Sequence, residues 1–407
     1  APQNLTLAAR VAAEPRARPG LSAALLDELR WALVARSRDP QADLRARIAA
    51  GLALGDLGDP RYEAREGPHG RYLMPPWIEV TGGTFTIGED AAIAYDDRGT
   101  RSTTSAHVPA HRLQLGPFRL ARFPVTNAEW ACFMAAGAYD QDIWWQSADA
   151  RLWRQGLLSN QAGKANNRFW RRRFLAEAGL FERMAAEGGF AGPSVVACWR
   201  DWLALDQDAF EQAIELHFRP QRQNAPRYWQ DPPLRAAGQP VVGLSWYEAR
   251  AYCAWLSAQS GLAIRLPSEV EWEAAMRGPE ARPYPWGSSF VALQANTFEG
   301  RLRRSSPVGV FPAGDSPSGL ADGAGNVLEW TTSLWGDMED LNNSSPPFAY
   351  PYDAGDGREE ASAPPSVARI LRGGSWSSDQ HGARCSARLG EFPDARYANI
   401  GFRLLAE

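Results

Sequence analysis

Side chains able to do redox or metal chemistry are few and widely spaced in this sequence. The four cysteines are Cys132, Cys198, Cys253 and Cys385, and none of them forms a CxxC pair with another. The first three have apolar or aromatic neighbours, which is typical of buried free thiols that pack as small hydrophobic residues. The cysteines therefore favour a packing role over a reactive pair.

The C-terminal segment 369–403 has an unusual order of residue types. RILRGGSW at 369–376 and NIGFR at 399–403 are strand-like and marked by glycines, and the residues between them differ in type almost throughout. Gly373 and Gly374 suit a turn or a bulge where a strand bends. No catalytic set lies between the two motifs, so the segment predicts a rigid frame that displays a binding surface.

Length and composition indicate a soluble globular protein. The chain has 407 residues and a net charge of -4, so it lacks the basic excess that nucleic-acid binding uses. No apolar run approaches the ~18 residues of a membrane span, and Arg10 and Glu14 interrupt any signal-peptide core. We expect a cytoplasmic protein without a nucleic-acid partner or a membrane span. Lys164 is the single lysine, so nearly all positive charge comes from arginine. This bias suits the ion pairs of a protein from a thermophile, and a GC-rich genome would also produce it.

The elements that would position the C-terminal surface begin with helices. Leucine spacing predicts helices over 21–34 and 43–54, and the Gly and Pro residues of 55–60 end the second one. One helical pair cannot bury its own apolar face. We therefore expect residues 1–72 to form a helical segment packed on a main domain of residues 73–407.

The main domain is predicted to combine short strands with few helices. Alternating apolar and β-branched residues predict strands at 77–80, at 84–87 and within 112–123. Thr126 with Glu129 and Ser245 with Glu248 have the spacing of capping boxes, which start helices, and a further helix begins at 267–269.

Residues 139–233 are rich in Trp and Arg, which predicts an insertion with helices near 170–184 and 196–218. Such residues could form a nucleic-acid surface. Glu177 and Glu182 follow at helical spacing, which favours ion pairing within the insertion instead.

Seven motifs, in this order, resemble those of the formylglycine-generating enzyme or sulfatase-modifying factor family. They are GGTFTIG at 82–88, FPVTN at 123–127, PVVGLSWYEA at 240–249, RLPSEVEWEA at 265–274, YPWG at 284–287, GLADGAGNVLEW at 319–330, and RGGSW at 372–376 with GFR at 401–403. The resemblance covers roughly 77–405 apart from the insertion. It implies an α+β, C-type-lectin-like fold with much irregular chain.

The resemblance implies the family's chemistry only where the reactive groups are present. The redox-active cysteine pair of the family would begin at Ser378, and no thiol lies between there and Arg384. Serine is a poor ligand for Cu(I), which prefers thiolates. A related branch has a three-histidine iron site in an N-terminal helical domain, and none of the five histidines shows HxxxH spacing in such a helix. We therefore predict that the chain is not an enzyme and requires no cofactor; the alternative is a family oxidoreductase or an inactive regulatory relative.

The variable proteins of diversity-generating retroelements, a third branch, resemble the C-terminal segment best. This resemblance implies a variable region at 369–403 in which adenine-directed mutation changes the ligand-binding positions. Those positions are Ser377, Ser378, Asp379, His381, Gly382, Ala387, Leu389, Gly390, Glu391, Phe392, Ala395, Tyr397 and Ala398. Gln380 and Glu391 cannot arise from such codons, so they are fixed or speak against the assignment. His381, Phe392 and Tyr397 are the expected anchors for a ligand, which we expect to be a protein.

Two further residues match a structural calcium site of the family. Asn326 and Glu329 lie at positions that bind calcium through oxygen atoms. The alternative is that Asn326 bonds the loop backbone and Glu329 pairs with an arginine. Arginines 372, 388 and 403 are expected to tie loops together through carboxylates or carbonyls.

Overall fold

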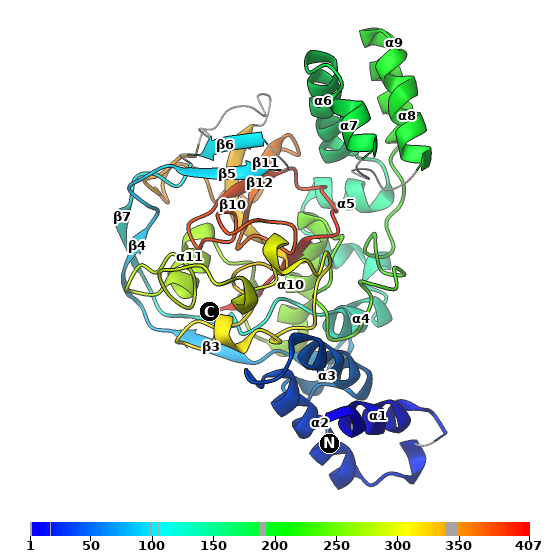
Figure 1. Cartoon of the computed structure of the whole chain (residues 1–407), viewed down its shortest axis with the longest axis vertical. Helices are drawn as coiled ribbons and strands as arrows, with labels where there is room; N and C mark the ends of the chain where they lie inside the picture. The colour runs from blue at the N-terminus through cyan, green and yellow to red at the C-terminus, as the bar shows by residue number, and fades with distance from the viewer. Residues whose placement is uncertain (1, 17, 98–99, 105, 187–192, 338–347) are drawn as a thin grey trace.

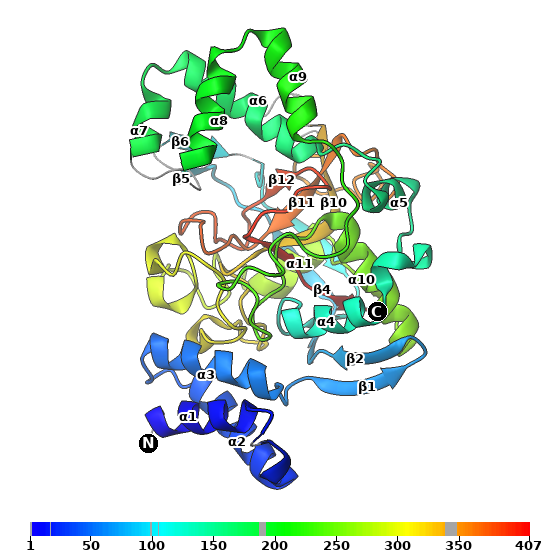
Figure 2. The same cartoon turned by 90° about the vertical axis from the view of Figure 1, so that its right-hand side faces the viewer.

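The structure, a computed structural model, describes residues 2–16, 18–97, 100–104, 106–186, 193–337 and 348–407. A body of strands, loops and few helices forms the middle of the molecule, with N-terminal helices at one end and the helices of the insertion at the other (Figure 1). Figure 2 shows the same three parts from the side. In the described part of the chain, every helix is too short or too polar to span a membrane.

The N-terminal helices are α1 (Pro2–Ala13), α2 (Ala23–Ser37) and α3 (Leu44–Leu57). They share a small apolar cluster around Leu33 and Leu54, and Arg47 of α3 donates to the carbonyl of Val310 in the body at 2.7 Å. The two predicted helices are thus present as α2 and α3 and packed on the body, whereas α1 was not predicted. Helical structure ends at Leu57, however, and a hairpin of β1 (Glu63–Gly67) and β2 (Gly70–Met74) follows, because Gly-Pro-His-Gly at 67–70 provides a tight turn.

Two four-stranded sheets form the frame of the body. One has the order β12 (Leu389–Glu391), β11 (Val367–Arg372), β10 (Leu328–Asp337), β13 (Ile400–Phe402), and only the β10–β13 pair is parallel. The other has the order β3 (Trp77–Val80), β8 (Phe118–Ala121), β14 (Leu405–Ala406), β9 (Ile264–Arg265). Two-stranded sheets join β4 (Gly83–Ile87) to β7 (His111–Leu115) and β5 (Ile93–Asp97) to β6 (Thr100–Thr104). The C-terminal segment therefore contributes β11, β12 and β13 to the first sheet, and β14, directly after the segment, belongs to the second.

Three helices fill the space beside these sheets. They are α4 (Asn127–Ala135), α10 (Trp246–Ser260) and α11 (Glu269–Arg277), and each begins with a complete capping box, at Thr126, Ser245 and Ser268. Aromatic rings pack at the centre: the Trp130 ring is stacked on Tyr252 and edge-on to Phe402. The predicted capping boxes and strands, and the mixed α+β fold with much irregular chain, are confirmed.

The insertion contributes α5 (Ala148–Gln155), α6 (Gln161–Ala176), α7 (Leu180–Ala186), α8 (Pro193–Ala204) and α9 (Gln207–His217). The last four share an apolar cluster of their own, separate from the core of the body. Glu177 accepts from Arg183 at 2.8 Å and Glu182 from Arg200 at 3.0 Å, so the predicted pairing within the insertion is confirmed.

Candidate functional site

Buried arginines fix both ends of the C-terminal segment. Each predicted arginine pairs with a glutamate: Arg372 with Glu273 (2.6 Å), Arg388 with Glu269 (2.6 Å) and Arg403 with Glu329 (2.8 Å). All six side chains are almost completely buried. The expectation that these arginines tie loops together is confirmed. Buried ion pairs hold the segment between Arg372 and Arg403 at both of its ends.

A cluster of hydroxyl groups surrounds Ser378, where the family resemblance would place the first cysteine of the redox pair. The backbone N–H of Ser375 donates to Ser378 Oγ at 3.0 Å, and Ser375 and Ser377 share a hydrogen bond of 3.0 Å. Asn399 Nδ2 donates to the hydroxyls of Ser375 (3.2 Å) and Ser377 (3.1 Å). Trp376 Nε1 donates to the carbonyl of Ala398 at 3.4 Å. The structure thus brings the two ends of the predicted surface, around 377 and 398, together.

The loop 377–382 is held through its backbone. Phe298 N–H donates to the carbonyl of Ser378 at 2.9 Å, and Gln380 N–H donates to Glu299 Oε1 at 2.8 Å. Asp379 Oδ1 accepts from the backbone N–H groups of His381 (3.0 Å) and Gly382 (2.9 Å). These bonds fix the loop without using the side chains of Ser377 or His381.

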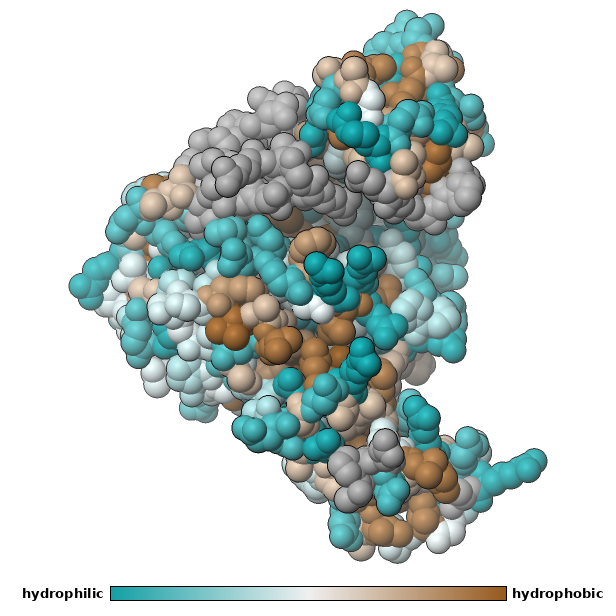
Figure 3. Space-filling view, in the orientation of Figure 1, coloured by the Kyte–Doolittle hydropathy of each residue, from teal (hydrophilic) through white to brown (hydrophobic). Residues whose placement is uncertain are grey.

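An apolar group on the neighbouring loop was not predicted from the sequence. Val291, Leu293 and Phe298 are 46%, 66% and 62% exposed, and Phe298 is bonded to Ser378 as described. Figure 3 shows apolar residues gathered on the face of the body that the 280–310 loops (yellow in Figure 1) cover, with hydrophilic residues around them. A sequence without periodicity does not tell an exposed apolar residue from a buried one, so no signal in 291–298 could have identified them.

The predicted binding positions differ in exposure. Leu389 is exposed; the half-buried positions are Ser377, Ser378, Asp379, His381, Gly382, Ala387, Glu391, Tyr397 and Ala398; and Gly390, Phe392 and Ala395 are buried. Phe392 and Ala395 belong to the main apolar core, and Tyr397 packs against it. Their predicted contact with a ligand stays a prediction, and among the three anchors only His381 lies on the loop 377–382.

The second half of the segment faces the insertion. Asp394 accepts from the backbone N–H groups of Gln161 (2.6 Å) and Ala162 (3.0 Å) at the start of α6. Burial raises the pKa of Asp394 to about 6 and that of Glu391 to about 8. The carboxylates of Glu391 and Asp394 therefore bind protons more tightly than carboxylates in water do.

The thiol closest in sequence to this surface points inward. Cys385 is completely buried, and burial raises the pKa of its thiol to about 12. All four cysteines are free. A thiol with such a pKa stays protonated near neutral pH and is a weak nucleophile.

The predicted calcium ligands are engaged by protein donors. Glu329 accepts two hydrogen bonds from Arg403 (3.0 and 2.8 Å) and one from Trp272 Nε1 (2.7 Å). Asn326 Oδ1 accepts from Asn296 Nδ2 (3.0 Å) and from the N–H of Ser306 (2.9 Å). A guanidinium at Glu329 already supplies the positive charge there, so this donor set does not fit a calcium ion.

The strand order and the long irregular connections define an α+β protein. The model of the sulfatase-modifying factor enzyme 1-like domain matches residues 65–407. The chain belongs to this family, and both the family and the fold predicted for it are confirmed.

Named relatives differ in what they do. A hercynine oxygenase of Mycolicibacterium smegmatis is 30% identical in an alignment of 375 positions that covers 88% of this chain and only 66% of the oxygenase. A formylglycine-generating enzyme of Mycobacterium tuberculosis is 27% identical in an alignment of 360 positions that covers 82% of this chain and 99% of that enzyme. The solved Treponema denticola variable protein 1 is 15% identical, with a TM-score of 0.44, over 85% of this chain and 99% of that protein.

The prediction that the chain is not an enzyme is contradicted by these relatives, two of which are named as enzymes. The prediction went too far because it rested on two absences, the missing thiol at Ser378 and the missing HxxxH spacing of the histidines. A missing thiol excludes thiol chemistry at that one position and says nothing about other groups of the chain.

Proposed function

We propose that this chain recognises a protein ligand through residues 291–298 and 377–382, which we call the display face. The observation that carries the proposal is the exposed apolar group of Val291, Leu293 and Phe298 beside a polar loop with a fixed backbone. Protein interfaces combine an apolar centre with a polar rim, and aromatic side chains supply much of the binding energy. Phe298 would be the apolar anchor and His381 part of the rim.

The retroelement assignment belongs to the same proposal. Buried arginine–glutamate pairs and backbone hydrogen bonds hold the segment, so a change at His381 would cost within about 0.5 kcal/mol of stability. Such a surface can vary without unfolding its frame. A near-copy of the 369–403 coding segment beside a reverse transcriptase, differing only at adenines, would support variation; differences without adenine bias would contradict it.

Capture of ligand by the immobilised full chain tests the proposal. Phe298→Ala and His381→Ala should each reduce capture of one and the same protein, by about tenfold for the aromatic anchor, with little change in melting temperature. Arg222→Ala is the matched control, because its side chain is 66% exposed and lies in the insertion. Equal capture by all four proteins, or loss of capture only together with unfolding, would contradict the proposal.

A turnover assay runs beside the capture experiment. The chain is supplied with copper, oxygen and a cysteine-containing peptide, the reactants that the family resemblance implies. Turnover that Ser378→Ala abolishes would assign a catalytic function to the same face in addition to recognition.

A further inference from the structure

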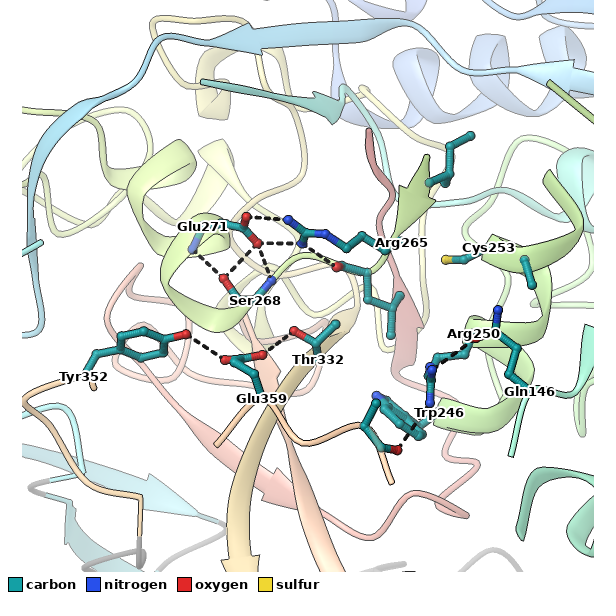
Figure 4. A pocket seen from close by; sticks show the side chains of 14 residues that line it. Gln146, Trp246, Arg250, Cys253, Arg265, Ser268, Glu271, Thr332, Tyr352 and Glu359 are labelled. Atoms are coloured by element: carbon teal, nitrogen blue, oxygen red, sulfur yellow. Dashed lines mark hydrogen bonds and ion pairs between the residues drawn. The ribbon is translucent and has the colours of Figure 1, made fainter. Parts of the chain in front are cut away.

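A pocket of about 520 Å³ lies on the body, away from the display face. It is lined by residues of α10, β9, the start of α11, β10 and the loop 352–361 (Figure 4). The volume is within the range of small-molecule sites, and no residue of 377–398 lines the pocket. The function proposed above therefore does not use it.

One wall presents a positive charge. Arg250 is half-buried, with its guanidinium 4.6 Å from the centre of the Trp246 ring. It donates to Gln146 Oε1 at 3.1 Å and to the carbonyl of Ala361 at 3.4 Å. No carboxylate among the described residues pairs with it, and burial lowers the pKa of Arg250. The stacking and the two carbonyl acceptors fix the cation without neutralising it.

Another wall presents a carboxyl group. Glu359 accepts from Thr332 Oγ1 at 2.6 Å and from Tyr352 OH at 2.9 Å, and Ser333 Oγ is a third donor. No arginine, lysine or histidine of the described chain pairs with it, and burial raises the pKa of Glu359. Three hydroxyl donors leave the carboxyl group to act as an acceptor, and its charge is not neutralised.

Arg250 and Glu359 line one and the same pocket. Ala361, whose carbonyl accepts from Arg250, follows Glu359 by two residues, so their Cα atoms are within about 7 Å of each other. Figure 4 shows Glu359 bonded to Tyr352 and Thr332, and Arg250 bonded to Gln146, across the same pocket. By contrast, Arg265 and Glu271, also in the lining, neutralise each other at 2.7 Å.

Apolar side chains complete the lining. Cys253, Ile264 and Leu266 are buried and belong to α10, β9 and the residue after β9. The pocket therefore offers a cation, an anion and an apolar wall within one small volume. Uncompensated charges that are partly withdrawn from water are costly, so a ligand that meets both of them gains most.

We infer that this pocket binds a free amino acid with an apolar side chain. Its carboxylate meets Arg250, its ammonium group meets Glu359, and its side chain packs on the wall formed by Cys253, Ile264 and Leu266. A ligand with a single charge leaves one wall uncompensated and binds more weakly.

Calorimetric titration of the full chain with three probes tests the inference. L-leucine carries both charges, isocaproate lacks the ammonium group, and isoamylamine lacks the carboxylate. We expect leucine to bind roughly tenfold or more tightly than either single-charge probe, the effect of one charged hydrogen bond. Absence of leucine binding, or equal binding of the three probes, would overturn the inference.

Variants assign each charge to its wall. Arg250→Gln should weaken leucine and isocaproate and leave isoamylamine unchanged, whereas Glu359→Gln should weaken leucine and isoamylamine and leave isocaproate unchanged. Arg222→Gln, at an exposed position, should change nothing. If Glu359→Gln does not fold, Arg250→Lys, which keeps the charge, should bind leucine better than Arg250→Gln does. A variant that weakens the binding of all three probes equally would contradict the assignment of one ligand charge to each wall.

Discussion

At the scale of single residues, loss of one partner destabilises the folded protein more in a buried charge pair than in an exposed one. Glu329 and Arg403 are almost completely buried and 2.8 Å apart, whereas Asp140 and Arg222 are 74% and 66% exposed at 2.6 Å. Removing one partner of a buried pair leaves a charge without water or counterion. Solvent screens the exposed pair, which therefore contributes little.

Glu329→Gln should therefore lower the free energy of unfolding by about 3–5 kcal/mol, and Asp140→Asn by less than about 1 kcal/mol. Chemical denaturation of both variants beside the wild type measures the difference. Similar losses for both would mean that the arginine pairs do not hold the C-terminal segment.

The titration of Glu391 makes stability depend on pH. Burial raises the pKa of its carboxyl from an ordinary value of 4.5 to about 8, so the folded chain holds a proton that the unfolded chain releases. Its contribution to stability is complete below pH 4.5 and is lost as the pH rises through 8. Glu391→Gln stays neutral, so its melting temperature should fall less between these pH values. Burial also raises the pKa of Glu129 to about 8, and this residue keeps part of the slope in the variant; identical slopes for variant and wild type would contradict the prediction.

At the scale of elements, short sequence motifs predicted the helix starts that they form and did not predict the neighbouring turns and boundaries. The capping boxes at Thr126 and Ser245 place side chain and backbone partners three residues apart, so the helix starts could be predicted from the sequence. The hairpin at 63–74 and the boundary between α8 and α9 were not predicted. The first depends on a short turn, and the second depends on Asp206, which caps α9 by accepting from Ala209 N–H.

Strand β12 limits which predicted positions can vary. A Cβ added at Gly390 would lie 2.3 Å from Trp335 Cγ, whereas one at Gly382 would meet its nearest atom, Ser378 Cβ, at 3.2 Å. Gly390→Ala should therefore destabilise the protein by about 1–3 kcal/mol, the usual effect of overpacking, and Gly382→Ala should cost clearly less. Thermal unfolding of the pair tests this. An equally small effect at both positions would restore Gly390 to the freely variable set.

At the scale of the whole molecule, the display face joins segments that are far apart in the chain. Phe298 and Ser378 meet through one backbone hydrogen bond, and the arginines at the two ends of the C-terminal segment bind glutamates from α11 and β10. The seven sequence motifs predicted the strands and helices of the body because each motif forms the same local structure wherever it occurs. They could not predict the apolar half of the face, because that half depends on which loop lies beside the C-terminal segment.

Hydrogen exchange of the full chain, with and without the captured protein ligand, shows whether the display face binds it. We expect slower exchange at 291–299 and 377–382 in the complex, with the N-terminal helices and the insertion unchanged. Protection confined to α1–α3 or to α6–α9, with the display face still exchanging freely, would contradict it.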